Sequence, residues 1–535
     1  MNVFNMMNAK ITIVLMWTMF CAGVSVAQQV AKGYVYEDSN KNGVKDRNEK
    51  GIANVAVSNG LDVMLTDKNG LYKLPVEDDN ILFVIKPEGY QVLLDTNNIP
   101  RFYHIHKPLG SPDSLKFAGV EPTGELPRSV DFALYPVHEE SSFRCIIFGD
   151  PQMRDDEELE YFEKGVVREL VGEKDALFGI SLGDLAYDNL AVHPGYKNTI
   201  GKIGLPWYQV LGNHDMNLDV GVDSLSDETY ERNFGPPNYA FNYGNAHFIV
   251  LDNILYPDPR GITSYYGGFR KDQLTFIANN LKYVPKDKLI ILAFHIPLLS
   301  PDFYNNDVFN DEDRKQLFSL LSDYPNTLSL SAHTHLQRHN FYTEQEGWMQ
   351  DKPHHEFNIG TTSGDWYSGK LTDGGYPPAT MRDGTFRGYA FLNIDDNTYT
   401  IDYKSTGEDA DFVMNITAPS IVPQGNRSSY QVHVNFFIGT PTDVVEFRVD
   451  SGPWKQMTSV LDFDPYYLHL QYEWDMTAEL LPGRRPSAAR QSTHLWRAAL
   501  PTNLPLGTRI IEVRARDMFG RVFTQKKPYL IDTLN

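Results

Sequence analysis

The chain has 535 residues, of which 41% are hydrophobic and 22% charged, so its composition is that of a globular protein and excludes a disordered chain. Its 48 Lys and Arg against 69 Asp and Glu give a formal net charge of −21, which argues against nucleic acid as a partner. Any attraction for a phosphate must therefore come from local groups. This length predicts about three or four domains.

Residues 1–27 have the pattern of an export signal. Lys10 is the only charge there, residues 11–26 are mostly apolar, and Ser25-Val26-Ala27 matches a small-x-small cleavage site. The apolar run is short for a membrane span, and no other segment of the sequence approaches that length. We therefore expect an exported protein (periplasmic, outer-surface or secreted) without a transmembrane segment. Soluble export is favoured over lipid attachment at Cys21.

Strand and helix signals predict three folded parts after this segment. Residues 28–138 and 411–535 carry short apolar or alternating runs separated by turn residues, which predicts a small all-β sandwich at each end. Residues 139–410 alternate buried-strand runs with amphipathic helix patterns. The helix patterns span 155–170, 273–281 and 312–321. The expected fold is multidomain, with a central α/β sandwich flanked by helices.

Five short segments of the middle region carry metal-ligand residues in a fixed order. They read FGDPQ (148–152), GDLAYD (183–188), GNHD (212–215), FHIP (294–297) and AHTH (332–335). They follow predicted strands, and open α/β sheets place ligands at the C-terminal ends of strands. Carboxylate, amide and imidazole groups suit Mn, Fe, Zn or Co, and the pattern does not choose among these metals. Five such segments in order are hard to produce by chance.

These segments resemble the motifs of the calcineurin-like metallophosphoesterase superfamily, over roughly half of the chain. The resemblance implies a centre of two divalent metals, with Asp184 bridging both ions. The implied ligands are Asp150, Asp184, Asn213, His295, His333 and His335. The two flanking β regions are similar to the accessory domains of an exported bacterial subgroup of this superfamily.

Two residues near the implied ligands leave alternatives open. The first motif of the superfamily usually ends in His, whereas this chain has Gln152, whose amide oxygen either ligates a metal or only positions water. Tyr187 has the GDxxY spacing with which purple acid phosphatases bind iron through a phenolate. The alternative for Tyr187 is an ordinary wall of the pocket.

The resemblance and the residue types together predict hydrolysis of phosphate esters. A hydroxide held between the two metals would attack phosphorus, and His214 would protonate the leaving oxygen as a general acid. Asp215, the next residue, is a candidate support for this chemistry. Asp365, Trp366 and Arg382 lie in loops beyond the last metal segment and are candidate substrate contacts.

The leading interpretation is an exported, metal-dependent phosphoric ester hydrolase that acts on a small-molecule phosphate ester. The first alternative is a phosphodiesterase that acts on a lipid headgroup or a glycan phosphate. The second alternative is a catalytically weak surface binding protein that has kept its metal ligands. A nuclease is not expected, because the chain is acidic and has no basic patch.

Residues 38–49 match a calcium-binding loop of twelve residues. The ligand positions hold Asp38, Asn40, Asn42, Val44 (through its carbonyl), Asp46 and Glu49. Gly43 stands at the sharp turn of the pattern. The flanks are β rather than helical, and the segment resembles the calcium loops of secreted β-sandwich repeats of bacterial adhesins. A hairpin loop that binds no ion is the alternative.

Three histidines and one cysteine lie outside these motifs. His247 is expected to be a strand residue, and His354 and His355 are expected to lie in a polar loop that faces water. Cys145 lies in a mostly apolar run and is expected to be a buried structural thiol. No catalytic role is predicted for any of the four.

Overall fold

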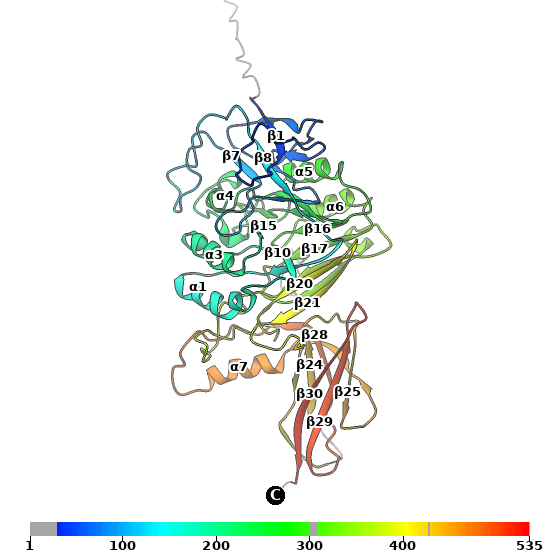
Figure 1. Ribbon diagram of the computed structural model, residues 1–535. Helices are drawn as coiled ribbons and strands as arrows, with labels where there is room; N and C mark the ends of the chain where they lie inside the picture. The colour runs from blue at the N-terminus through cyan, green and yellow to red at the C-terminus, as the bar shows by residue number, and fades with distance from the viewer. Residues whose placement is uncertain (1–28, 300–307, 426–428, 534–535) are drawn as a thin grey trace, which may run out of the picture.

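The computed structural model describes residues 29–299, 308–425 and 429–533, so the expected export signal lies outside the described residues. Three β-rich parts follow one another along the molecule, and the helix-flanked part lies in the middle (Figure 1). Each sheet draws its strands from only one of the three predicted regions, although the limits near 139 and 411 stay a prediction. One cluster of buried apolar side chains includes residues of all three parts.

The N-terminal part is built from two four-stranded sheets, in the orders β4-β1-β8-β6 and β3-β2-β5-β7. Their strands are β1 (Gln29–Glu37), β2 (Ala56–Ser58), β3 (Val63–Leu65), β4 (Leu71–Val76), β5 (Asn80–Val84), β6 (Tyr90–Val92), β7 (Tyr103–His106) and β8 (Phe132–Pro136). Alternate residues of β4 are buried, as expected for a strand with one face on a core. A Cβ atom at Gly33 would lie 1.7 Å from the carbonyl oxygen of Val130, so only glycine allows this approach.

The middle part is built mainly from a five-stranded sheet, β11-β10-β9-β20-β21, and a six-stranded sheet, β12-β13-β16-β17-β19-β18. The first contains β9 (Ser142–Phe148), β10 (Ala176–Ser181), β11 (Trp207–Gln209), β20 (Gly388–Asp395) and β21 (Thr398–Ser405). The second contains β12 (Tyr239–Tyr243), β13 (Ala246–Val250), β16 (Leu289–Ala293), β17 (Thr327–Ser331), β18 (Arg338–Tyr342) and β19 (His354–Asn358). A short pair, β14 (Ile254–Leu255) and β15 (Tyr266–Gly267), lies apart from them. The strands β9, β10 and β11 run parallel, and so do β13, β16, β17 and β19.

Helices cover both sides of the middle part, with α1 and α3 on one side and α5 and α6 on the other (Figure 1). The main helices are α1 (Asp156–Phe162), α2 (Arg168–Leu170), α3 (His193–Ile200), α4 (Glu228–Phe234), α5 (Lys271–Leu281) and α6 (Asp311–Leu320). The short helical turns are η1 (Glu163–Val167), η2 (Leu190–Val192), η3 (Gly201–Ile203), η4 (Asn213–Asp215), η5 (Asp223–Leu225) and η6 (Glu344–Glu346). The carboxylate of Asp155 accepts hydrogen bonds from the backbone N–H groups of Glu157 and Glu158 and so begins α1. Within the described ranges, no helix has the length and apolar character that a membrane crossing requires.

The C-terminal part combines the sheets β22-β24-β28-β27 and β23-β30-β29-β25-β26. Its strands are β22 (Met414–Thr417), β23 (Ile421–Pro423), β24 (Gln431–Phe436), β25 (Val444–Val449), β26 (Lys455–Gln456), β27 (Thr458–Phe463), β28 (Gln491–Ala499), β29 (Gly507–Arg516) and β30 (Val522–Asp532). The sequence predicted only strands here, whereas α7 (Pro465–Asp475) follows β27. Asp464 begins this helix by accepting a hydrogen bond from the backbone N–H of Tyr467. Figure 1 shows α7 beside the C-terminal sandwich, at the end of the sandwich that faces the middle part.

Three histidines of the middle part are buried within the six-stranded sheet. His247 lies in β13 as expected, but the prediction that His354 and His355 face water is wrong, because both belong to β19. The ring nitrogens of His354 bond to the hydroxyl oxygens of Thr327 and Ser329, both on the neighbouring strand β17. These partners are 25 and 27 residues away in sequence, so the residues around His354 do not reveal them. The local composition is polar, and it therefore predicted a loop where β19 forms.

Burial lowers the pKa of His247 to about 4, lowers that of His354 to about 3, and lowers that of His355 as well. A histidine whose folded-state pKa lies below the unfolded value of about 6.5 stabilises the fold fully above that pH, and the contribution is lost as the pH falls toward the folded pKa. We therefore expect the free energy of unfolding to decrease between about pH 7 and pH 5, by about 2 kcal/mol for each such histidine.

The variant His354→Gln tests this expectation by urea unfolding at a series of pH values. It should be less stable than the parent protein at neutral pH, because the ring is lost from the core, but its stability should fall less steeply toward acid. His138→Gln is the matched control, because that side chain is 84% exposed. If the free energy of unfolding fell equally steeply with pH in His354→Gln and in the parent protein, this result would contradict the account.

Candidate metal centre

The five segments with metal-ligand residues meet at one edge of the two central sheets. They follow the C-terminal ends of β9, β10, β11, β16 and β17 directly or within three residues. Because the strands of each group are parallel within their sheet, their C-terminal ends lie at the same edge. The side chains of the six implied ligands and of Gln152 are buried, apart from His333, which is half-buried.

The backbone at this edge is held in an unusual conformation. Positive φ angles occur at Asp150 (29°), Gln152 (44°), Asp184 (49°), His333 (69°) and His335 (54°). Such angles cost about 1–3 kcal/mol in residues with side chains and persist where the surrounding structure enforces them, often at functional sites. The edge is therefore shaped to present these side chains rather than to minimise backbone energy.

One group of ligand atoms lies around the imidazole of His295. Its Nε2 atom is 3.1 Å from Asn213 Oδ1, 3.3 Å from Asp184 Oδ1 and 3.1 Å from His333 Nδ1. In the described part of the chain, Asp184, His295 and His333 form the one group of three acidic, histidine or cysteine side chains whose ligand atoms lie within 4.8 Å of one another. The Nδ1–H of His295 donates to the carbonyl oxygen of Leu182 at 2.8 Å, which leaves the Nε2 lone pair facing this group.

A second group lies around Asp150. Its Oδ2 atom is 3.1 Å from His335 Nε2, and the Nδ1–H of His335 donates to the carbonyl oxygen of Gly364 at 2.8 Å. Because the proton of His335 is on Nδ1, its Nε2 atom is an acceptor, and it faces a second acceptor, Asp150 Oδ2. Gln152 donates through Nε2 to Asp184 Oδ2 at 2.8 Å. Within the described structure, Asp150 Oδ2 and Gln152 Oε1 are buried without a hydrogen-bond partner, which costs free energy unless a cation lies beside them.

The electrostatics of the site favour positive charge. Burial acts to lower the pKa of His295, but the charges of Asp184 and Asp150 outweigh burial and raise this pKa to about 9. Burial acts to raise the pKa of Asp184, but the imidazoles of His295 and His214 lower it overall. A proton or a divalent cation among these groups is therefore stabilised, and the donor set of carboxylate, amide and imidazole fits a divalent transition metal.

His214 lies beside this centre with partners of its own. Its Nδ1 atom is 2.7 Å from Asp188 Oδ1, and its backbone N–H donates to Asp184 Oδ1 at 2.9 Å. The ring of Tyr187 stacks on the imidazole, with ring centres 4.4 Å apart and an interplanar angle of 16°. Burial acts to lower the pKa of His214, and the charges of Asp184 and Asp188 raise it overall.

Asp215 is a structural support that holds two loops together. Its carboxylate accepts hydrogen bonds from the backbone N–H groups of Leu185, Ala186 and Gly212, and it lies 3.1 Å from His193 Nε2. It thereby ties the segment 183–188 to the segment 212–215. The carboxylate that contacts the His214 ring is that of Asp188. Asp188 is the last residue of the GDLAYD segment, and no role was predicted for it.

The candidate substrate contacts separate into two kinds. Trp366 stacks on His335, with ring centres 4.3 Å apart, and the guanidinium of Arg382 is 5.9 Å from the Trp366 ring. Asp365 is buried, and its Oδ2 atom accepts hydrogen bonds from three groups, so its contact with substrate stays a prediction. The donors are the hydroxyls of Ser368 and Tyr467 and the backbone N–H of Ser487. Asp365 therefore anchors the C-terminal part to the loop of residues 360–369, which we call the pocket loop.

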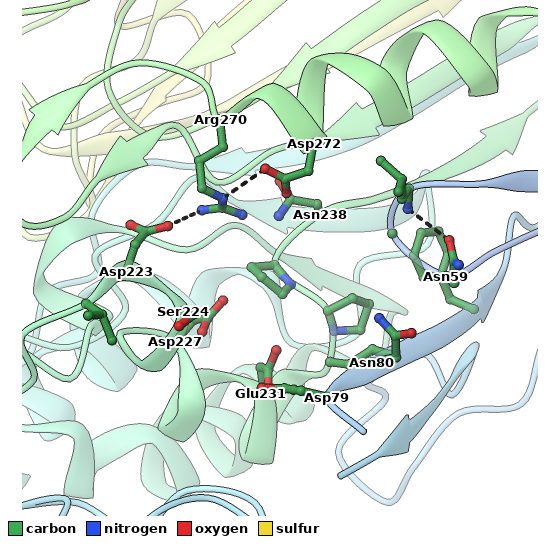
Figure 2. Close-up of a pocket in the computed structure, with 17 residues that line it drawn as sticks. Asn59, Asp79, Asn80, Asp223, Ser224, Asp227, Glu231, Asn238, Arg270 and Asp272 are labelled. Atoms are coloured by element: carbon green, nitrogen blue, oxygen red, sulfur yellow. Dashed lines mark hydrogen bonds and ion pairs between the residues drawn. The ribbon is translucent and has the colours of Figure 1, made fainter. Parts of the chain in front are cut away.

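A cavity of about 630 Å³ lies elsewhere, between the N-terminal and middle parts. Figure 2 shows acidic side chains around it, among them Asp79 from the N-terminal part and Asp227 and Glu231 from the middle part. Arg270 contacts Asp223 at 2.8 Å and Asp272 at 3.5 Å in the same view. None of the implied metal ligands lines this cavity, so it is separate from the metal centre.

Comparison with known proteins gives three family matches. The family model described as calcineurin-like phosphoesterase matches residues 143–337. The models described as the N terminal and the C terminal of calcineurin-like phosphoesterase match residues 39–121 and 356–523. The match to residues 143–337 contains all five segments with metal-ligand residues.

Curated relatives match shorter stretches. The probable glycerophosphodiester phosphodiesterase GpdQ of Arcobacter nitrofigilis is 27% identical over 146 residues, which is 26% of this chain and 49% of that protein. The serine-aspartate repeat-containing protein D of Staphylococcus aureus is 42% identical over 66 residues, which is 11% of this chain and 5% of that protein. This chain thus spans less than half of the length of each. A purple acid phosphatase structure from yellow lupin (Lupinus luteus) seeds aligns with a TM-score of 0.37 and 14% identity, over 67% of this chain and 69% of that chain.

The geometry of Gln152 generates a prediction about metal binding. Gln152→Leu keeps the size of the side chain but removes both the buried amide oxygen and the donor to Asp184. We expect one of two manganese ions to bind about 10–100 times more weakly, as is typical when a ligand or its supporting hydrogen bond is lost. Calorimetric titration of the metal-free protein with manganese measures both affinities.

Gln345→Leu is the control, because Gln345 is exposed in η6 and distant in sequence from the five segments. It should bind manganese as the parent protein does. If Gln152→Leu also binds two ions with unchanged affinities, Gln152 neither ligates a metal nor supports Asp184 as a ligand.

Proposed function

We propose that this chain, which belongs to the calcineurin-like phosphoesterase family, is a metal-dependent phosphoric ester hydrolase. The observation that carries the proposal is the convergence of six ligand candidates from five separate segments at one sheet edge. Acceptor atoms of different segments face one another there at 3.1–3.3 Å, an arrangement that divalent cations stabilise. The donor set suits Mn, Fe, Zn or Co.

Different residues of the chain would hold the metals and transfer the proton in the proposed reaction. Two divalent ions, when bound, polarise phosphoryl oxygens and lower the pKa of water. Asp150, Gln152 and His335 would hold one ion, Asn213, His295 and His333 the other, and Asp184 would contact both. His214 then protonates the leaving oxygen, while Asp188 holds its Nδ1 and the Tyr187 ring restricts its rotation.

A phosphate monoester or a diester is the proposed substrate. The similarity to the probable glycerophosphodiester phosphodiesterase of Arcobacter nitrofigilis favours the diester alternative. The test is hydrolysis of nitrophenyl phosphate and bis(nitrophenyl) phosphate by protein loaded in turn with manganese, zinc, cobalt and iron. The proposal expects turnover that a chelator abolishes and metal restores. Two bound ions without turnover of any ester would support a surface binding protein instead.

The role of His214 can be separated from metal binding. Because general-acid catalysis contributes about 10²–10⁴-fold, His214→Ala should lower kcat by about that factor. Metal content should stay near that of the parent protein, since His214 is not among the six implied ligands. Steady-state kinetics and elemental analysis of the same preparation provide the two measurements.

His138→Ala is the control, because this histidine is exposed and its ring contacts Glu140. It should keep both turnover and metal content. Loss of metal from His214→Ala would identify His214 as a ligand, and unchanged turnover would remove it from the reaction.

We also propose that the loop 38–49 binds calcium and that the protein is exported, the latter resting on the pattern of residues 1–27. The carboxylate of Asp38 is buried and accepts hydrogen bonds from the backbone N–H groups of Asn42 at 3.2 Å and Gly43 at 2.8 Å. The carboxylate of Glu49 accepts from the backbone N–H groups of Ser39 and Asp46. Carboxylates that turn inward in this way, with Gly43 at φ +73°, support an ion site of oxygen ligands.

Calcium should then raise the melting temperature of the protein. At 10 to 100 times the dissociation constant, the expected gain is about 1.4–2.7 kcal/mol. Glu49→Gln should reduce this gain strongly, whereas Asp78→Asn, at an exposed position outside the loop, should keep it. A melting temperature that calcium leaves unchanged would show that the loop is an ordinary turn.

A further inference from the structure

Layered side chains flank the metal centre on the side of His214. The imidazole of His214 is covered by the ring of Tyr187, and the guanidinium of Arg154 lies 4.7 Å from the centre of that ring. Arg154 also lies 3.5 Å from Glu158, and its side chain is 34% exposed. The order is therefore imidazole, phenol ring and guanidinium, each one layer further from the metal ligands.

The same order repeats on the side of His335. Its imidazole is covered by Trp366, and the guanidinium of Arg484 lies 5.8 Å from the centre of the Trp366 ring. The Nη1 atom of Arg484 also donates to the carbonyl oxygen of Trp366 at 3.2 Å. Both arginines thus lie one aromatic ring away from an imidazole of the centre.

Arg484 belongs to the C-terminal part and is held firmly against the pocket loop. The backbone N–H of Gly369 donates to the carbonyl oxygen of Arg484 at 2.7 Å. Three residues further on, the backbone N–H of Ser487 donates to the buried carboxylate of Asp365 at 2.7 Å. The chain at Arg484 and three residues after it is therefore fixed to the loop that carries Trp366.

The charge of Arg484 is not balanced by a carboxylate. Across the described ranges, no carboxylate oxygen lies within 4.0 Å of its guanidinium, whereas the adjacent Arg485 contacts Asp475 at 2.6 and 2.7 Å. Burial lowers the pKa of Arg484, and the positive charge of Arg154 lowers it further, while the charges of Asp365 and Glu158 act to raise it. The acidic neighbour Glu158 already contacts Arg154, and Asp365 is occupied by its three donors.

A chain with a net charge of −21 thus keeps two arginines beside its metal centre; Arg154 contacts Glu158 at 3.5 Å, and Arg484 contacts no carboxylate among the described residues. We propose that Arg154 and Arg484 form a subsite for a second anionic group of the substrate, a phosphate or carboxylate that is separate from the ester that is cleaved. Guanidinium forks match the oxygens of such groups. The inference rests on the proposed function, and it makes the C-terminal part a contributor to substrate selection.

The test compares matched esters with one and with two anionic groups. One pair is a hexose monophosphate and the corresponding hexose bisphosphate; the other is a pair of nitrophenyl alkyl phosphates whose alkyl chain ends in a hydroxyl or in a carboxylate. The parent protein should prefer the doubly anionic member. Arg484→Gln should lower that preference in kcat/KM about tenfold or more, chiefly through KM, and Arg154→Gln should act in the same direction. Arg484→Lys should keep part of the preference, because it keeps the charge and loses the fork.

Arg485→Gln is the control, because Asp475 holds that neighbour, and it should keep the preference of the parent protein. An equal loss for both members of a pair would show that Arg484 contacts the cleaved phosphate or only supports Trp366, and it would overturn the inference. A parent protein without preference would overturn it as well.

If no ester is hydrolysed, the proposed function has failed. The affinity of the protein for doubly anionic esters then tests whether the subsite exists. Calorimetry should show that the hexose bisphosphate binds the metal-loaded parent protein about tenfold or more tightly than it binds Arg484→Gln. The hexose monophosphate should bind the two proteins with similar affinity. Equal affinities of the two proteins for the bisphosphate would overturn the inference independently of turnover.

Discussion

The structure depends on one constraint: buried parallel strands of two sheets end at a common edge. Each strand needs only backbone pairing and apolar neighbours to form, and the polar residues that follow its end are then forced together. At that edge the backbone adopts positive φ angles at five ligand candidates, and carboxylate, amide and imidazole acceptors face one another. Gly183, at φ +90°, allows this crowding, because an added Cβ atom would lie 2.6 Å from His295 Nδ1.

The strand ends could be predicted because each motif directly follows the buried run that forms its strand. The ligand set itself was implied by the resemblance of the five segments to the motifs of the superfamily, and it stays a prediction. The fold class followed from the same buried runs and from the helix patterns between them. The partner of His214 could not be predicted in this way. Asp215 is adjacent to His214 in sequence and Asp188 is 26 residues away, yet the fold places Asp188 against the ring and commits Asp215 to three backbone N–H groups.

Other features depend on contacts that sequence spacing does not reveal. The sequence predicted His354 and His355 to be loop residues, whereas they belong to β19, which pairs with β17 and β18. Arg484 lies 118 residues from Trp366 in sequence, and no local signal connects them. The helix α7 did carry a signal, a capping Asp464 before a proline, which the prediction of an all-β region passed over. The C-terminal part is thus connected to the metal centre through the pocket loop, by Asp365 and Arg484.

The central claim is that two divalent ions share Asp184 between the ligand groups around His295 and Asp150. Anomalous diffraction from crystals of the protein grown with manganese tests this claim most directly. The account predicts two strong peaks that both contact Asp184, one beside His295 and His333 and the other beside Asp150 and His335. No peak at this sheet edge, with manganese present in excess, would contradict it.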